Sequence, residues 1–180
     1  MSGAPGSGKS TIAAELCRRH QMVSIDHDVV KSALLETGSL ADAGPASYQV
    51  LLALAESLLG QGHPVIVDSP CFYDELLAAG RSLAARAGVR YVYVECRLDD
   101  LDLLDSRLTG RVALRSQRAS VAAPPVDDAR AGSDGQDQFR VWIAGMKRPD
   151  HDYLLLDTSR DLDLCVRDVE DFLRARGLVS

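Results

Sequence analysis

A glycine-rich sequence near the amino terminus has the residue types and the spacing that hold phosphate groups. It satisfies the pattern GxxxxGK[ST] in full, over Gly3-Ala4-Pro5-Gly6-Ser7-Gly8-Lys9-Ser10-Thr11. Glycines let the backbone curl so that successive N–H groups point at phosphate oxygens, and the positive end of the following helix adds to the attraction. In such a loop Lys9 would reach the β- and γ-phosphates, and the Ser10 hydroxyl would ligate Mg²⁺. Because the motif opens an amphipathic helix, we favour a nucleoside triphosphate site over a chance glycine-rich turn.

Asp68 is the first of two acidic positions that bear on what happens to a bound triphosphate. It ends an apolar run and is therefore expected at the carboxyl edge of a sheet, where it would support the metal. The alternative is a strand-end aspartate that only starts a turn. Ser69 follows it, where nucleotide-hydrolysing motors commonly carry a water-activating glutamate, and this disfavours a dedicated hydrolase.

Asp28 is the more diagnostic carboxylate. It follows a second short apolar run, in Ile25-Asp26-His27-Asp28, so its side chain is expected to face the same crevice as the glycine-rich loop. A phosphotransferase needs a carboxylate that orients and deprotonates the acceptor hydroxyl. We therefore interpret Asp28 as a general base and Asp26 as a helix N-cap. The alternatives are a structural role for Asp28 and a catalytic role for Asp26. His27 is interpreted as a neighbour without a role of its own.

The loop and the paired aspartates together resemble a known family. A loop of the form GxPGSGKST, followed after one helix by hydrophobic-D-x-D-x-x-[RK], is similar to the small P-loop kinases. These include adenylylsulfate kinases, gluconate kinases and the 5′-kinase domain of polynucleotide kinases, with zeta-toxin sugar kinases more distant; such chains are also described as AAA family ATPases. The resemblance implies that Asp28 is the general base, that Lys31 contacts the substrate or a phosphate, and that Asp68 lies near the metal. Lys31 stands where adenylylsulfate and polynucleotide kinases carry Arg, which weakens bidentate recognition of an anion.

Four arginines recur at helical spacing later in the chain, at Arg107, Arg111, Arg115 and Arg118. Like charges on one helix face repel by about a few tenths of a kcal/mol per pair unless an anion lies there. The segment looks like the lid of small-molecule kinases, over about residues 99–138. Such a lid closes over ATP and would bring Arg111 and Arg115 to the transferred phosphoryl, where charge stabilisation gives about 10³–10⁵ in rate. The alternative is a solvated helix face paired with upstream aspartates.

The remaining pattern alternates helices with short apolar runs. We expect strands at 22–25, 64–68, 91–96 and 153–157, helices at 9–20, 46–60, 73–87, 99–118 and 161–176, and a long loop over 119–138. Strands that alternate with helices predict a parallel sheet covered on both faces. The fold class is therefore α/β. The resemblance implies the three-layer sandwich of a P-loop NTPase, with strand order 2-3-1-4-5, in a single domain over residues 1–180.

Strand 1 of that order, the strand that precedes the P-loop, has too few residues in this sequence. A P-loop links a strand to a helix, yet only Met1 and Ser2 precede Gly3. We therefore expect the central strand to be missing or reduced to a stub, because the start is mis-assigned or the protein is truncated. That would leave two buried strands without partners for their backbone hydrogen bonds. A version extended by several apolar residues is expected to be more stable.

Composition narrows the classes of function. The 180 residues are 46% hydrophobic and carry a formal net charge of −6. A length of 180 residues suits one domain. The negative net charge argues against a general nucleic-acid or membrane-surface binder, whose binding surface would be basic. No apolar run approaches the roughly 18 residues of a spanning helix, and no signal peptide is recognisable. The four scattered cysteines indicate reduced thiols, so a cytoplasmic location without membrane partners is expected.

These features predict an ATP- and Mg²⁺-dependent phosphotransferase that acts on a hydroxyl of a small molecule. A polynucleotide or RNA 5′-end kinase is the alternative within this class, and the acidic balance disfavours it. Alternatives of other classes are an NTPase or nucleotide-binding switch without an acceptor, and a nucleotide-binding subunit that has lost activity. The acceptor and the oligomeric state stay open.

Overall fold

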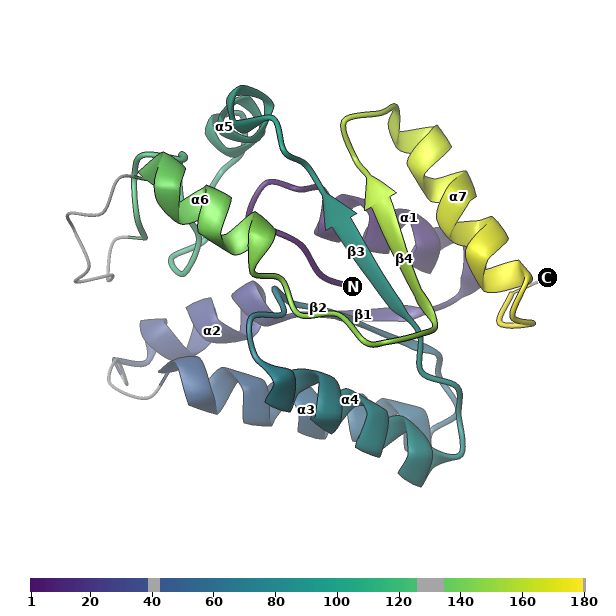
Figure 1. The fold of residues 1–180 in the computed structure, drawn as a ribbon. Coiled ribbons are helices and arrows are strands. Elements are labelled where there is room, and N and C mark those ends of the chain that lie inside the picture. The colour runs from purple at the N-terminus through teal and green to yellow at the C-terminus, as the bar shows by residue number, and fades with distance from the viewer. Residues whose placement is uncertain (39–42, 126–134, 180) are drawn as a thin grey trace.

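The computed structural model describes residues 1–38, 43–125 and 135–179, with the strands at its centre (Figure 1). Within those residues the strands are β1 (Val23–Asp26), β2 (Val65–Asp68), β3 (Tyr93–Arg97) and β4 (Tyr153–Asp157). The helices are α1 (Lys9–His20), α2 (His27–Glu36), α3 (Ala43–Gly60), α4 (Asp74–Ala87), α5 (Leu101–Thr109), α6 (Gly135–Ala144) and α7 (Leu162–Arg174). Strands and helices alternate along most of the chain, so the predicted α/β class is confirmed.

The strands pair in parallel, β1 with β2 and β3 with β4. In the first pair Val23 lies opposite Val65, and Asp26 lies opposite Asp68. Both aspartates therefore end their strands at the carboxyl edge, which is where parallel sheets bind ligands. The register alone brings together two carboxylates that are far apart in the sequence.

Met1 and Ser2 connect the two strand pairs. The Met1 ammonium donates to the carbonyl oxygen of Val67 at 2.7 Å, and the Ser2 N–H donates to that of Val94 at 2.7 Å. The two residues thus lie between β2 and β3, where the expected order puts the strand that precedes the P-loop. Between the pairs lies an apolar cavity of about 450 Å³, lined in part by the side chains of β2 and β3. The full strand order stays a prediction.

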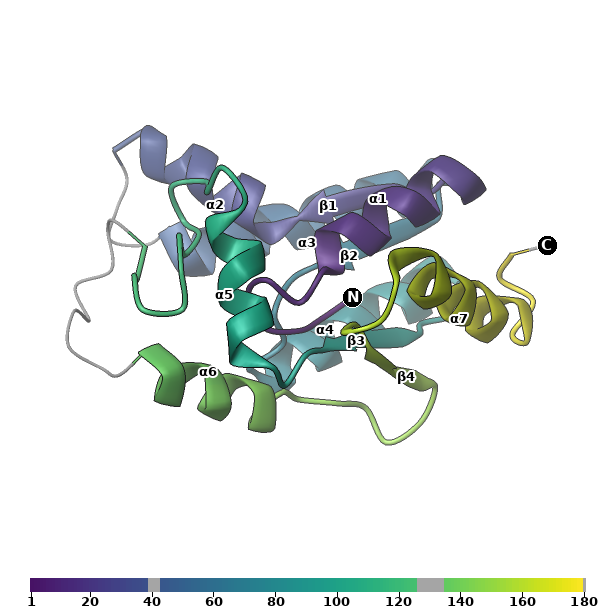
Figure 2. The same cartoon turned by 90° about the horizontal axis from the view of Figure 1, so that it is seen from above.

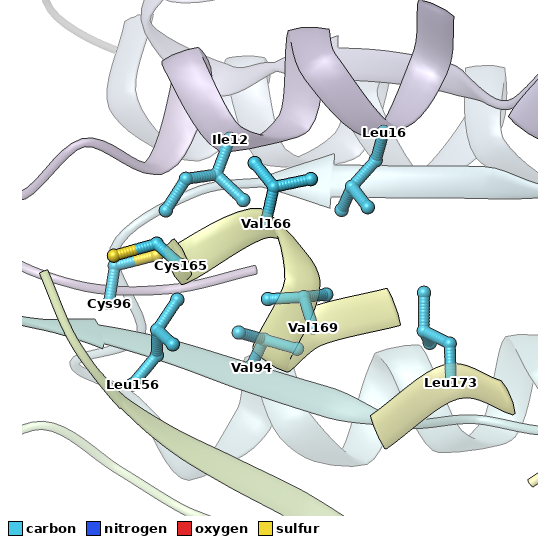
Figure 3. Packing of buried hydrophobic residues seen from close by; sticks show 9 residues of the cluster. All are labelled: Ile12, Leu16, Val94, Cys96, Leu156, Cys165, Val166, Val169 and Leu173. Atoms are coloured by element: carbon cyan, nitrogen blue, oxygen red, sulfur yellow. The ribbon is translucent and has the colours of Figure 1, made fainter. Parts of the chain in front are cut away.

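Helices cover both faces of the strands (Figures 1 and 2). Helices α1 and α7 lie on one face, and α3 and α4 lie on the other. The buried residues of helix α7 recur at helical spacing, so the helix packs one stripe of its surface against the core. Figure 3 shows this core, formed by Ile12, Leu16, Val94, Cys96, Leu156, Cys165, Val166, Val169 and Leu173. This core holds α1, the helix that follows the P-loop, against the sheet.

The helix predicted over 99–118 is wrong in its second half. Helix α5 ends at Thr109, and Gly110 follows as its C-cap. The next residues leave the helix and pack on α2, where the Ser116 hydroxyl donates to the Asp28 carbonyl oxygen at 3.0 Å and the Ser116 N–H to the Ser32 hydroxyl at 3.0 Å. These contacts between distant segments outweigh the local helical pattern. The arginine stripe that the pattern implied does not form.

The predicted loop over 119–138 is also only partly correct. Its residues 126–134 lie outside the described part of the chain, and helix α6 begins at Gly135, inside the expected loop. The apolar residues Phe139 and Ile143 are buried on α6.

In the described ranges no helix is both long and apolar enough to cross a membrane.

Arg118 serves the structure rather than the predicted stripe. Its guanidinium lies over the rings of Phe139 and Trp142, 5.5 Å from each centroid, and donates to the Val121 carbonyl oxygen at 2.9 Å. The side chain is buried. Arg118 therefore ties the segment after α5 to α6.

Replacing Arg118 with alanine is expected to lower the free energy of unfolding by about 2–3 kcal/mol. The change removes a desolvated cation–π contact and leaves a backbone carbonyl without its donor. Urea unfolding measures the loss, with Arg140→Ala, an exposed arginine of α6, as the matched control. A large fall in ATP affinity at unchanged stability would instead indicate that Arg118 acts in ATP binding, as the predicted lid requires.

Candidate active site

The glycine-rich loop has a backbone that suits its predicted role. Gly3 has φ +145°, and a Cβ built there would lie 2.3 Å from the Cys96 carbonyl oxygen, so only glycine fits. Gly8 has φ +87° and is the N-cap of α1, whose N–H groups then face the loop. Lys9 folds over the same loop, and its Nζ donates to the Ala4 carbonyl oxygen at 3.1 Å. The loop is therefore preshaped as an anion cradle.

Ser10 and Asp68 meet at the carboxyl edge of β2. The Ser10 hydroxyl donates to Asp68 Oδ2 at 2.6 Å, and Asp26 Oδ2 lies 3.3 Å from the same hydroxyl oxygen. Burial, together with the charge of Asp68, raises the pKa of Asp26. Asp68 is 2% exposed, and its buried Oδ1 has no hydrogen-bond partner among the residues that the structure describes.

A magnesium ion fits this donor set. Hydroxyl and carboxylate oxygens are hard ligands that Mg²⁺ prefers, and an orphaned buried carboxylate oxygen is costly without a cation or donor. Mg²⁺ usually keeps several waters and takes only one or two protein ligands beside substrate phosphates. Ser10 and Asp68 would hold the ion, which supplies charge stabilisation at the phosphates when bound.

Asp28 lies in the first turn of α2, directly after β1. The N-cap role expected for Asp26 is confirmed, since Asp26 Oδ1 accepts the Asp28 N–H at 2.7 Å. This cap turns the Asp28 side chain toward the P-loop side, where Gln117 Nε2 donates to its Oδ2 at 3.1 Å. Burial by itself would raise the pKa of Asp28, but the neighbouring His27 ring and the Lys9 ammonium outweigh it and hold the pKa below its usual value. Asp28 is therefore an anion at neutral pH.

A polar cleft of about 430 Å³ unites these parts. Its lining includes eight of the predicted site residues, Pro5, Gly6, Gly8, Lys9, Ser10, Thr11, Asp28 and Arg111. It further includes Ile12, Arg107, Gly110, Gln117, Thr158, Arg160, Leu162 and Cys165. A phosphate cradle, a carboxylate and three arginines thus face one space.

Two of the predicted substrate and phosphate contacts lie apart from that lining. Lys31 is on α2, one turn beyond Asp28, and Arg115 is in the segment after α5. Among the described residues, the cleft lining contains neither of them. The roles assigned to Lys31 and Arg115 therefore stay predictions.

Several lining residues were missed or underrated by the sequence reasoning. Arg107 reaches the cleft from the last turn of α5, and its Nη2 donates to the Thr158 carbonyl oxygen at 2.8 Å. Gln117 reaches Asp28 only because the segment after α5 folds back on α2. No spacing in the sequence predicts Gln117, whereas Arg160 follows a predicted strand end and could have been proposed on that ground.

Replacing Ser10 with alanine is expected to weaken the apparent affinity for Mg²⁺ by about tenfold or more, because a metal ligand and a fixed partner of Asp68 are lost. A titration of nucleotide binding with Mg²⁺ measures the shift. ATP binding measured in EDTA is the control and should change little. Equal Mg²⁺ dependence in the variant and the wild type would remove Ser10 from the metal site.

Among the solved structures that share this fold are two kinases. A sugar kinase from Janibacter aligns with a TM-score of 0.65 at 13% identity, over 99% of this chain and 95% of that one. The adenosine phosphosulfate (APS) kinase of Mycobacterium tuberculosis, solved with AMPPNP and APS, aligns with a TM-score of 0.63 at 22% identity, over 96% and 94%. The three-layer P-loop kinase architecture is therefore the fold of this chain.

Sequence comparison gives the family. An uncharacterised protein of Mycobacterium tuberculosis is 31% identical over 158 residues, which cover 81% of this chain and 31% of that protein. The chain thus spans about a third of the length of this relative. Residues 1–134 match the family model described as AAA domain, and they include the P-loop, Asp28 and Asp68. The chain belongs to this AAA-domain family of P-loop proteins.

Proposed function

We propose that the protein is an ATP-dependent phosphotransferase that moves the γ-phosphoryl to a hydroxyl of a small molecule. One observation carries the proposal: the polar cleft that holds Lys9 and Ser10 of the P-loop also holds the Asp28 carboxylate. A nucleotide-binding switch has no need of a base in this place. A kinase needs one beside the phosphoryl that it transfers.

Five groups that line the cleft, together with Asp68 beside Ser10, have roles in this reaction. Lys9 binds the β- and γ-phosphates, and Ser10 and Asp68 would hold Mg²⁺, which supplies charge stabilisation when bound. Asp28 accepts the proton of the acceptor hydroxyl while the hydroxyl oxygen forms a bond to the γ-phosphorus and ADP leaves. Arg107 and Arg111 offset the charge on the transferred group. Arg115 remains the weaker candidate for that role, because only its place in the sequence supports it.

The comparisons support the class of reaction. The fold is shared with a sugar kinase and with an APS kinase whose structure holds an ATP analogue and a hydroxyl-bearing nucleotide substrate. The longer mycobacterial relative carries further sequence, so the acceptor of the whole protein is an open part of this proposal.

A release assay tests the proposal. ADP formation is followed with ATP and Mg²⁺, alone and with nucleosides, sugars, aminoglycoside antibiotics or RNA 5′ ends. The proposal expects one small-molecule class to stimulate ADP release. Stimulation by RNA ends alone would establish the polynucleotide kinase alternative, and equal release with every addition would favour the switch.

A further inference from the structure

A tight turn over residues 114–117, in the segment after α5, packs against the start of α2. The Gln117 N–H donates to the Leu114 carbonyl oxygen at 2.9 Å, which closes the turn. Two residues of the segment, Arg111 and Gln117, line the polar cleft. One stretch of chain therefore brings both a cation and an amide to the space that Asp28 also lines.

Two buried serines fasten this turn to α2. The Ser116 hydroxyl donates to the Asp28 carbonyl oxygen at 3.0 Å and accepts from the Ser32 hydroxyl at 2.9 Å. The Ser116 N–H donates to the Ser32 hydroxyl oxygen at 3.0 Å. Each hydroxyl donates its single proton once, so the three bonds are compatible. The backbone of the turn is thus held at Asp28 without help from the side chain of Gln117.

The side chain of Gln117 joins this turn to the carboxylate of Asp28. Its Oε1 accepts the Leu114 N–H at 3.2 Å, and its Nε2 donates to Asp28 Oδ2 at 3.1 Å. A backbone N–H can only donate and an ionised carboxylate can only accept, so the two partners determine which end of the amide is oxygen and which is nitrogen. The amide is therefore held at both ends, by its own turn and by Asp28.

We propose that Gln117 is a positioning residue, which holds the Asp28 carboxylate in the orientation that accepts the proton of the acceptor hydroxyl. This inference rests on the proposed function. The terminal torsion of an aspartate is broad, so a carboxylate without a fixed partner would rotate away from the reacting hydroxyl. A general base works only within hydrogen-bond reach of the proton that it takes. Gln117 supplies the fixed partner.

The reaction itself leaves Gln117 unchanged. The acceptor O–H bond breaks, its proton bonds to the Asp28 carboxylate, and its electron pair forms the new bond to the γ-phosphorus as the bond to the ADP oxygen breaks. The Gln117 amide keeps its own protons throughout. Its N–H favours the ionised form of Asp28, which is the form that can act as a base.

The groups around Asp28 set the background for this contact. The titratable ones that act on its carboxyl are Lys9 in α1, Asp26 at the end of β1, His27 in α2 and Tyr48 in α3. Burial by itself raises the pKa of Asp28, and the contacts with His27, Lys9 and Gln117 lower it by more. Loss of the Gln117 amide therefore moves the pKa of Asp28 upward while the other groups stay in place.

A carboxyl titration tests the contact without ATP or any acceptor. Carbon-13 NMR follows the Asp28 carboxyl with pH in the wild type and in Gln117→Met, and Asp28→Asn assigns the signal. Methionine has about the same size but no amide, so the pKa of Asp28 should be higher in the variant. Gln61→Met, at an exposed glutamine directly after α3, is the control. An equal pKa of Asp28 in all three proteins would overturn the inference.

A second variant separates a role at Asp28 from a role in the turn alone. Gln117→Glu keeps an oxygen that can accept the Leu114 N–H, but it sets a carboxylate against Asp28 Oδ2 in place of a donor. The single-turnover rate of phosphoryl transfer should fall by at least about tenfold in Gln117→Met and further in Gln117→Glu. ATP affinity should stay near the wild-type value in Gln117→Met, because the P-loop contacts are unchanged. Gln61→Glu should transfer at the wild-type rate.

Each role of Gln117 gives a different result. Recovery of the wild-type rate in Gln117→Glu would mean that the side chain only closes its turn, and would overturn the inference. Wild-type rates in both Gln117 variants would also overturn it and would leave the proposed kinase reaction intact. A wild type that phosphorylates no acceptor would overturn the proposed function and the inference together. If Gln117→Met does not fold, Gln117→Glu, which keeps the bond within the turn, decides.

Discussion

Replacing Lys9 with alanine is expected to lower the affinity for ATP by about 30-fold to 4,000-fold. Lys9 lies in the cleft at the start of α1, and its ammonium already rests against the loop at Ala4. Removing one partner of a desolvated charge pair costs about 2–5 kcal/mol, and each 1.4 kcal/mol is tenfold in affinity. Calorimetric titration with a non-hydrolysable ATP analogue measures the change.

Lys147 offers a matched control for this experiment. Its Nζ lies 3.5 Å from Asp74 Oδ2, at the start of α4, and it is not part of the cleft lining in the described residues. Lys147→Ala therefore removes the same charge and should keep wild-type affinity. If Lys9→Ala and Lys147→Ala bind the analogue equally well, the glycine-rich loop is not the phosphate site.

Replacing Asp28 with asparagine is expected to lower phosphoryl transfer by about 10²–10⁴-fold, the usual contribution of a general base. Asparagine keeps the size of the side chain and can still accept from Gln117, which donates to Asp28 at 3.1 Å. It cannot take a proton. ATP affinity should stay near the wild-type value because the P-loop contacts are unchanged.

The matched control for Asp28 is another aspartate in the first turn of a helix. Asp102 has this position in α5 and lies outside the lining of the cleft as far as the structure describes it. Asp102→Asn should transfer at the wild-type rate. Steady-state rates over a range of pH compare the variants. Wild-type transfer by Asp28→Asn would exclude Asp28 as the base.

The parts that could be predicted from the sequence depend on local signals. The P-loop pattern and the stripe that follows gave helix 9–20, which matches α1, and the apolar run at 153–157 matches β4. The cap role of Asp26 follows from side-chain chemistry within three residues. Each of these features is specified by neighbours in the chain, so no knowledge of the packing is needed.

The parts that could not be predicted depend on contacts between distant segments. The pattern over 99–118 is helical, but Gly110 ends α5 and Ser116 packs on α2 instead. Gln117 becomes a partner of Asp28 by the same folding back. His27 Nε2 lies 2.9 Å from the hydroxyl oxygen of Ser47, twenty residues later in the chain, and no local pattern predicts that contact.

The fate of the γ-phosphoryl in ¹⁸O-labelled water tests the central claim most directly. The wild-type protein is incubated with ATP, Mg²⁺ and the acceptor class that stimulates ADP release, and the products are followed by ³¹P NMR and mass spectrometry. Transfer by the cleft that holds Lys9 and Asp28 predicts a phosphate ester without ¹⁸O, in an amount equal to the ADP formed. Inorganic phosphate that carries one ¹⁸O, with no ester, would mean that water is the acceptor and would contradict the account.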